Sequence, residues 1–301
     1  MKALVTGGAG FLGSHVVDML VARRDHVTIV DDGRTGITWN PEAVTRRVSV
    51  FDAPHPADLD VIFHLAGPVG PVGVIEQAGL INISIARDAA RVRDWALHLG
   101  ATLVYVSTSE IYGAQPPGPI REDAPRIVAA GHSARMEYAA AKLAAETMLL
   151  NTPGLDVRVI RPFNVAGPRQ RPDGGFVLPR FVRQALAGEP LTVYQPGTQR
   201  RAFTHVLDIA EGIVLAATRG HAGAVYNLGN PANECDILTL AREVVGATGS
   251  SSPIEVVDPR DLWGPAFHEA PDKVPDAGRA MLELGWHPKR DRARTIADAI
   301  G

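Results

Sequence analysis

The chain has 301 residues, 46% of them hydrophobic and 21% charged, with a formal net charge of −3 at pH 7. That length suits one large domain or a domain with a smaller companion, and the lack of a basic block argues against nucleic acid as a partner. No apolar run reaches the roughly 18 residues of a membrane span, and Cys235, the only cysteine, excludes an internal disulfide and favours a reducing cytoplasm.

The first residues carry the pattern of a dinucleotide-binding turn. Residues 2–6 read as a buried parallel strand and residues 12–23 as a helix, with a glycine-rich stretch between them. Gly7 permits a tight turn, Gly10 lets the backbone approach a pyrophosphate, and Gly13 lets the helix pack on the strand. The helix N-terminus offers amide donors and a favourable dipole to the phosphates. The predicted cofactor contacts in this stretch are Gly7, Gly10, Phe11, Leu12 and Gly13.

The next strand decides which cofactor is expected. It is predicted at 27–31 and ends in Asp31, eighteen residues after Gly13. A carboxylate at this place accepts hydrogen bonds from the adenosine ribose and repels a 2′-phosphate. The sequence therefore predicts NAD, and not NADP, as the cofactor.

The rest of the first half alternates strands with helices. Further strands are predicted at 48–52, 60–65, 101–107 and 156–161, and helices at 80–99 and 138–150. Such alternation with short links predicts a Rossmann-type, doubly wound α/β fold, in which helices cover both faces of a parallel sheet.

Tyr138 and Lys142 stand four residues apart within the predicted helix 138–150. That spacing places a phenol and an ammonium on one helix face, one turn apart. A nearby cation favours the phenolate, so Tyr138 is expected to act as a base near neutral pH.

Beyond residue 162, prolines divide the chain into shorter elements. Helices are predicted at 177–188, 207–219, 236–248 and 277–284, and short strands near 191–194 and 254–257. We interpret this part as a smaller α/β substrate lobe over the carboxyl ends of the strands. The predicted division is an NAD-binding Rossmann domain over 1–165 and a mainly substrate-binding lobe over 166–301.

These motifs carry a family resemblance. The glycine-rich turn with Tyr138 and Lys142 resembles the short-chain dehydrogenase/reductase superfamily, and the whole chain resembles its extended branch of nucleotide-sugar epimerases, dehydratases and decarboxylases. Further matches are His64-Leu65-Ala66, Arg161-Pro162-Phe163-Asn164, Gly167-Pro168-Arg169, Arg201-Ala202-Phe203-Thr204-His205-Val206 and Gly285-Trp286-His287-Pro288. The resemblance implies an enzyme in which Thr108 holds the sugar hydroxyl being oxidised. It also implies cofactor contacts from Asp52, Leu65, Ala66, Tyr138 and Lys142, and substrate contacts from Arg135, Asn164 and Arg201. Tyr194, in the predicted strand 191–194, is a further candidate to line the base or the sugar, and an ordinary strand residue is the alternative.

The residues after Thr108 distinguish the reactions within this family. Sugar 4,6-dehydratases typically have Asp-Glu there, whereas this chain has Ser109-Glu110, and a serine is a far weaker acid. Thr-Ser-Glu followed by a hydrophobic residue, Tyr and Gly resembles the UDP-glucuronate decarboxylases. Arg135, three residues before Tyr138, and Arg201, expected to face the sugar carboxylate, also match these enzymes. The catalytic residues implied are Thr108, Ser109, Glu110, Tyr138, Lys142 and Arg201.

One stretch departs from the decarboxylases, which usually have Pro-Ala-Ser-Pro and then a tyrosine near the sugar. Residues 67–74 read Gly-Pro-Val-Gly-Pro-Val-Gly-Val, with Val74 in place of the tyrosine. The expected products are UDP-xylose or the 4-keto pentose. A nucleotide-sugar epimerase acting at carbon 4 or 5, or a 4,6-dehydratase, is the alternative, and a non-catalytic NAD-binding protein is a remote one.

The expected partners are a UDP-sugar and a second copy of the chain. The resemblance implies a homodimer through a four-helix interface, built from residues 89–99 and the helix at 138–150; burial of these helices within one chain is the alternative. The ten histidines are scattered without paired ligand spacing, so no metal is expected. Because the glycine-rich strand begins at residue 2, no signal peptide is expected, and the predicted location is the cytoplasm.

Overall fold

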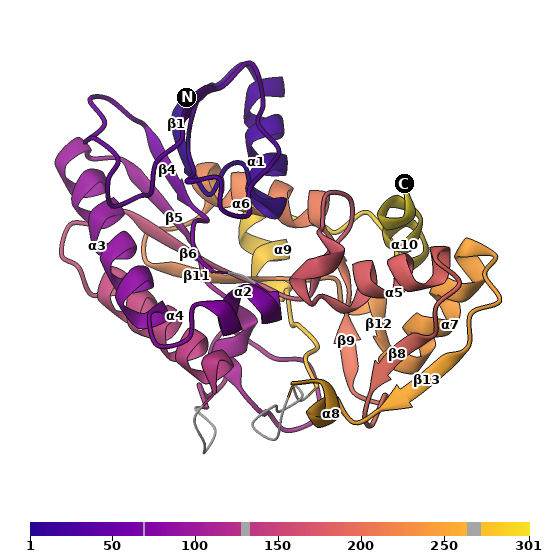
Figure 1. Ribbon diagram of the computed structural model, residues 1–301. Helices are drawn as coiled ribbons and strands as arrows, with labels where there is room; N and C mark the ends of the chain where they lie inside the picture. The colour runs from indigo at the N-terminus through magenta and orange to yellow at the C-terminus, as the bar shows by residue number, and fades with distance from the viewer. Residues whose placement is uncertain (69, 128–132, 264–271) are drawn as a thin grey trace.

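The computed structural model describes residues 1–68, 70–127, 133–263 and 272–301, and its centre is a parallel sheet (Figure 1). Within this part of the chain the sheet has seven strands in the order β11-β6-β5-β4-β1-β2-β3, and all neighbours are parallel. The strands are β1 (Lys2–Thr6), β2 (His26–Val30), β3 (Val44–Arg46), β4 (Val61–His64), β5 (Thr102–Val106), β6 (Val157–Pro162) and β11 (Ala224–Leu228). The strand order reverses at β1, as in a doubly wound fold, so the predicted fold class is confirmed.

Helices cover both faces of this sheet (Figure 1). They are α1 (Phe11–Ala22), α6 (Val206–Arg219) and α9 (Gly278–Leu284) on one face, and α3 (Ile81–Leu99) and α4 (Ala134–Leu150) on the other, with the short α2 (Gly70–Glu76) beside α4. Successive strand residues point to opposite faces and so enter two cores. In β5, Val104 and Val106 pack with α1 and α6, whereas Leu103 and Tyr105 pack with α3 and α4.

A smaller lobe lies beside the sheet and has a hydrophobic core of its own (Figure 1). Its helices are α5 (Val177–Leu186), α7 (Ile237–Thr248), α8 (Pro259–Trp263) and α10 (Arg292–Ile300). Its paired strands are β8 (Leu191–Tyr194) with β13 (Ile254–Val257), and β9 (Arg200–Ala202) with β12 (Glu234–Asp236), while β7 (Val165–Ala166) pairs with β10 (Thr204–His205). Among the described helices, none is both long enough and apolar enough to cross a membrane.

The chain returns from this lobe to the large sheet. Helix α6 packs against α1, and β11 pairs with β6 at the edge of the sheet, with Tyr226 opposite Ile160. The sequence pattern does not predict β11, because its alanine and asparagine are poor strand formers. Burial of Tyr226 and Leu228 against α6 and α9 decides the conformation instead.

The strand predicted at 48–52 is wrong, since the third strand is β3 at Val44–Arg46. Val50 is buried, which explains the strand-like pattern, but the backbone turns here and the Ala53 amide donates to the Ser49 carbonyl at 3.0 Å. Asp52 therefore does not end a strand; it lies exposed in this turn, where its carboxylate accepts a hydrogen bond from the Ser49 hydroxyl at 2.6 Å.

Helix α4 begins earlier than predicted, at Ala134, because Ser133 caps it. The Ser133 hydroxyl oxygen accepts a hydrogen bond from the Met136 amide at 3.3 Å. An N-cap serine of this kind satisfies an amide that the first helical turn leaves without a partner. The earlier start brings Arg135 into the same helix as Tyr138.

The carboxyl ends of the central strands meet at one edge of the sheet. Gly7 follows β1, Asp31 follows β2, Leu65 follows β4, Ser107 follows β5 and Phe163 follows β6. In open α/β sheets ligands bind outside this edge, at the point where the strand order reverses. Most of the predicted cofactor and catalytic residues follow these strands, whereas Asp52 lies in the turn after β3 and Arg201 lies on β9 in the smaller lobe.

Candidate active site

The turn after β1 has the shape that a pyrophosphate requires. Gly7 has φ +70°, and a Cβ atom on it would lie 2.7 Å from the Ala66 nitrogen. A Cβ atom on Gly13 would collide with the Gly7 carbonyl oxygen, so glycine alone allows this close approach. Helix α1 then begins at Phe11 with no side-chain cap and no acidic residue in its first turn. This cradle fits a dinucleotide whose phosphates lie at the helix N-terminus.

Asp31 turns its carboxylate back over the glycine-rich turn. Its two oxygens accept hydrogen bonds from the amides of Ala9, at 3.1 Å, and Gly33, at 2.8 Å. Burial raises the pKa of Asp31, and the two amide hydrogen bonds oppose that effect. The carboxylate is held at the end of β2, where the sequence places the adenosine ribose; the contact itself stays a prediction.

Tyr138 lies against the end of β5. Its phenol forms a hydrogen bond with the side chain of Thr108, whose Oγ1 also accepts from the Glu110 amide at 3.1 Å and so caps the 3₁₀ turn η1 (Ser109–Tyr112). Burial is the main cause that raises the pKa of Tyr138; the Glu110 carboxylate raises it further, and the Thr108 hydrogen bond lowers it. The four-residue spacing to Lys142 therefore does not by itself make Tyr138 a phenolate near neutral pH, because burial and Glu110 oppose the charge.

Lys142 is buried one helical turn after Tyr138. Its Nζ donates a hydrogen bond to the Val106 carbonyl at 2.9 Å, and only 4% of the residue is exposed. Burial lowers the pKa of Lys142 to about 8, while the carboxylates of Glu146 and Asp88 oppose this effect. Lys142 is thus a buried ammonium that deprotonates more readily than a surface lysine.

His64, at the end of β4, is neutral. Burial, together with the positive charge of Lys142, lowers the pKa of His64 to about 3. Its Nδ1 shares a hydrogen bond of 2.7 Å with the Thr6 hydroxyl. His64 therefore ties β4 to β1 beneath the cofactor turn and is a structural residue of this site.

Glu110 lies between two cations. Arg135 Nε donates to Glu110 Oε2 at 2.6 Å, and Lys273 Nζ forms an ion pair with Glu110 Oε1. Burial by itself would raise the pKa of Glu110, but the charges of Lys273 and Arg135 outweigh it and hold the pKa well below its usual range. Glu110 is therefore a carboxylate, and a poor proton donor.

Lys273 is a site residue that the sequence pattern does not predict. Its amide donates to the Arg200 carbonyl at 3.0 Å, and the residues after it pair with Ile120, whose amide donates to the Val274 carbonyl at 2.8 Å. The stretch 272–276 is thus held by both lobes. Only 2% of Lys273 is exposed. No motif surrounds this lysine, so the sequence offered no signal for its role.

The charge environment of Lys273 is unusual for a lysine. Burial has the largest effect and lowers the pKa of Lys273 to about 7. The Glu110 carboxylate opposes this change, whereas the positive charges of Arg135 and Arg201 add to it. Lys273 can therefore exchange a proton near neutral pH.

Arg201 and Asn164 lie next to Lys273. Arg201, on β9, is 6% exposed and forms a backbone bridge with Lys273. Asn164 has φ +39° and donates from Nδ2 to the Lys273 carbonyl at 3.4 Å. Thus the structure brings together most of the predicted substrate residues at the end of β5 and β6.

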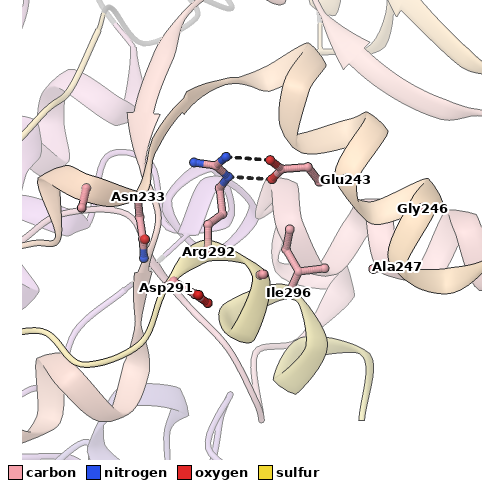
Figure 2. A pocket seen from close by; sticks show the side chains of 9 residues that line it. Asn233, Glu243, Gly246, Ala247, Asp291, Arg292 and Ile296 are labelled. Carbon is pink, nitrogen blue, oxygen red and sulfur yellow. Dashed lines mark hydrogen bonds and ion pairs between the residues drawn. The ribbon is translucent and has the colours of Figure 1, made fainter.

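Two predicted residues lie elsewhere. Tyr194 ends β8 in the smaller lobe, where the guanidinium of Arg180 lies 4.2 Å from its ring centre. Asp52 lies in the exposed turn after β3. Their contacts with substrate and cofactor stay predictions. A separate hollow of about 460 Å³ lies between α7 and α10, where Arg292 and Glu243 form a two-pronged ion pair (Figure 2), and none of the predicted site residues lines it.

Comparison with known proteins identifies the family of this chain. Residues 3–229 match the model of the NAD dependent epimerase/dehydratase family. The chain belongs to this family. It is therefore an enzyme of the extended short-chain dehydrogenase/reductase type that uses NAD, as the sequence predicted.

The relatives within this family include decarboxylases and an epimerase. The chain is 35% identical to the UDP-N-acetyl-alpha-D-glucosaminuronate decarboxylase of Bacillus cytotoxicus, over 99% of this chain and 96% of that protein. It is 34% identical to UDP-glucuronic acid decarboxylase 1 of Arabidopsis thaliana, over 96% of this chain and 66% of that longer protein. The UDP-glucose 4-epimerase of Thermotoga maritima, solved with UDP-glucose, superposes with a TM-score of 0.88 at 25% identity, over 100% of this chain and 97% of that one.

Proposed function

We propose that this family member decarboxylates UDP-glucuronate after transient oxidation at sugar carbon 4. One observation carries the proposal: Arg135 and Lys273, from separate segments, form ion pairs with Glu110 near Thr108 and Tyr138, and the charge of Arg201 lies close to Lys273. A carboxylate on the sugar would find charge-assisted hydrogen bonds here. A neutral sugar would have no use for such a group of cations.

NAD would be held by the glycine-rich turn, by Asp31, and by Leu65 and Ala66 at the end of β4. The tight contact between Gly7 and Ala66 supports this assignment, since any side chain at Gly7 would close the cradle. When bound, NAD supplies a hydride acceptor for carbon 4 and, in its oxidised form, a positive ring charge. We assign to Lys142 the fixing of the ribose and the support of a Tyr138 phenolate.

Tyr138 would act as the base for the hydroxyl on carbon 4. Thr108, which already shares a hydrogen bond with the Tyr138 phenol, would accept and donate hydrogen bonds to orient that hydroxyl. Burial and Glu110 raise the pKa of Tyr138, so the phenolate needs the positive charges of Lys142 and the cofactor nearby.

Loss of carbon dioxide would follow from the ketone at carbon 4. With a ketone at carbon 4 and a carboxylate attached to carbon 5, the oxidised sugar is a β-keto acid. The bond between carbons 5 and 6 then breaks, carbon dioxide leaves, and the electron pair of that bond forms the enolate of the ketone. Arg201 and Lys273 would bind the carboxylate before the step. The protonated Lys273 would then donate a proton to carbon 5 and become the neutral amine, because Glu110 is held ionised and Ser109 is a weak acid.

The test follows the carboxylate carbon. UDP-glucuronate labelled at carbon 6 should release labelled carbon dioxide in the presence of the enzyme and NAD, and mass spectrometry should show UDP-xylose or the 4-keto pentose. A product of unchanged mass with the label retained would refute the decarboxylase and favour the epimerase alternative.

A second candidate substrate is the 2-acetamido form of the same uronate. This chain covers 96% of the Bacillus relative, and that relative is named for the 2-acetamido substrate. The sequence at residues 67–74 also differs from that of the UDP-glucuronate decarboxylases. It has no tyrosine near the expected sugar site, and residues from Gly70 onward form the apolar helix α2. Competition between the two UDP-uronates in one reaction, read as the ratio of kcat/KM values, decides which is preferred.

We further propose that the enzyme is a cytoplasmic homodimer, with residues 1–165 mainly binding NAD and residues 166–301 mainly binding the nucleotide sugar. Helices α3 and α4 lie side by side, and α3 leaves Ile83 66% exposed and Leu97 40% exposed on its outer side. Apolar side chains on a pair of helices suit a four-helix interface with a second copy. The single cysteine supports a reducing compartment.

A further inference from the structure

Tyr105, on β5, occupies a place where an aliphatic residue would be expected. The core between the sheet and helices α3 and α4 is otherwise built there from Ile62, Leu103, Val157 and Val159. Tyr105 is fully buried, and its hydroxyl has no hydrogen-bond partner among the described residues. A buried hydroxyl without a partner costs free energy. The aromatic ring, and not the hydroxyl, therefore explains why a tyrosine is found at this position.

The face of this ring meets the ammonium of Lys142. Lys142 Nζ lies 4.9 Å from the centre of the Tyr105 ring, within the range of a cation–π contact. The same Nζ donates a hydrogen bond to the carbonyl of Val106, the next residue of β5, at 2.9 Å. Two successive residues of one strand thus hold the ammonium, one by its carbonyl and one by its ring.

The remaining groups around Lys142 show why such a contact matters. On its own helix α4 lie Tyr138 and Glu146, on α3 lies Asp88, and on β4 lies His64, which is neutral. Among the described residues, none of these four groups accepts a hydrogen bond from the ammonium, and burial disfavours its charge. An electron-rich ring face stabilises a buried cation without introducing a carboxylate that would fix it in an ion pair.

We propose that Tyr105 is a positioning residue of the reaction, whose ring holds the Lys142 ammonium in place and in its charged form through a buried cation–π contact. His64 stacks on the same ring, with centroids 5.6 Å apart and planes 28° apart, and so fixes the ring in turn. The proposal rests on the role given to Lys142 in the proposed function, but the contact can be measured without turnover.

The chain offers a direct readout because it has only four lysines: Lys2, Lys142, Lys273 and Lys289. Lysine labelled with carbon-13 at Cε gives one NMR resonance for each of the four lysines. Lys142→Arg and Lys273→Arg variants assign the resonances of the two buried lysines. Each resonance can then be titrated in the full-length protein, with and without saturating NAD. In Tyr105→Leu the titration midpoint of Lys142 should fall by about 0.4–1.5 pH units, the equivalent of a lost cation–π contact. In Tyr105→Phe, which keeps the ring, it should stay at the wild-type value.

Two controls accompany this titration. Lys273, the other buried lysine, should keep its midpoint in every Tyr105 variant. Tyr226→Leu removes a ring that is equally buried, in the core on the other face of the same sheet, and should leave Lys142 unchanged. An unchanged Lys142 midpoint in Tyr105→Leu, or an equal fall in Tyr226→Leu, would overturn the proposal.

A second series covers the case in which Tyr105→Leu fails to fold. Phenylalanine with one, two and three ring fluorines at position 105 keeps the shape of the ring while weakening its negative face. The Lys142 midpoint should fall stepwise along this series, and a flat series would overturn the proposal. With UDP-glucuronate, the alkaline limb of the kcat/KM profile should move to lower pH in parallel. A shifted Lys142 midpoint in a protein that turns over no UDP-uronate would refute the proposed function and leave the contact standing.

Discussion

Lys142 and Lys273 are both buried at the site, and burial lowers the pKa of the first to about 8 and of the second to about 7. Each must be protonated for its proposed role, Lys142 to support the Tyr138 phenolate and Lys273 to protonate carbon 5. A lysine loses its charge as the pH rises through its pKa. Deprotonation of either Lys142 or Lys273 should therefore lower the activity of the enzyme as the pH rises.

The first prediction concerns this pH dependence. The kcat/KM for UDP-glucuronate should fall in two steps, with apparent pKa values near 7 and near 8, since kcat/KM reports the free enzyme. Lys273→Arg keeps the positive charge but removes the proton donor, so turnover should fall; because arginine does not titrate in this range, the residual activity should show only the step near 8. Retention of both steps in Lys273→Arg would remove Lys273 from the pH profile.

The second prediction concerns the base. Tyr138→Phe should lower kcat by roughly two to four orders of magnitude, because the phenol that takes the proton is gone. The affinity for NAD, measured by calorimetry, should change little, and the thermal unfolding midpoint should confirm that the variant is folded. Activity close to that of the wild type would show that another group is the base.

At the scale of elements, one buried ion pair joins strand β6 to helix α4. Arg161 donates from Nε and Nη2 to the two oxygens of Glu146, at 3.1 and 2.6 Å, and from Nη1 to the Tyr112 hydroxyl at 2.8 Å. Arg161 is fully buried and Glu146 is 1% exposed. The pair thus links β6 to the helix that carries Tyr138 and Lys142.

The third prediction follows from this pair. Arg161→Met should lower the free energy of unfolding by about 3–5 kcal/mol, because it leaves the Glu146 carboxylate buried without its partner. The double variant Arg161→Met/Glu146→Leu should recover a large part of that loss, since it buries no charge. Urea unfolding of the wild type and the two variants measures both effects. Equal losses in the single and double variants would show that the ion pair itself, and not the stranded charge, sets the stability.

At the scale of the whole molecule, the outer face of α3 is where a second copy is proposed to bind. Ile83 and Leu97 are separated by about four helical turns and so span the length of the helix. Arg87, between them, packs over Phe51 with the guanidinium 4.4 Å from the ring centre. The face is thus apolar at its ends and polar in the middle.

The fourth prediction tests this interface. Light scattering after size exclusion should give the wild type twice the mass of the 32.1 kDa chain. Ile83→Glu should shift it toward the single chain, because a charge would be buried at the contact. Leu282→Glu, at an 86% exposed leucine on α9 across the sheet, is the control and should leave the mass unchanged. A wild type that already runs as a single chain would refute the dimer.

The sequence by itself determined the features whose residues lie close together along the chain. The turn from Gly7 to Gly13, the carboxylate at Asp31 and the pair Tyr138 and Lys142 each fall within one or two elements, so local spacing fixes their geometry. Alternating strands and helices likewise determined the doubly wound fold. These patterns sufficed for the family and the cofactor, which the comparisons confirm.

The tertiary structure decided what depends on distant segments. Lys273 reaches Glu110 because the stretch 272–276 is held between Ile120 and Arg200, and no local pattern encodes that path. β11 forms because burial outweighs weak strand propensity, and residues 48–52 turn despite an apolar pattern because Ser49 and Asp52 bond to each other. The charge states of the site were decided in the same way. Burial and neighbouring charges, set only by folding, hold Glu110 ionised, raise the pKa of Tyr138 and lower the pKa of both buried lysines.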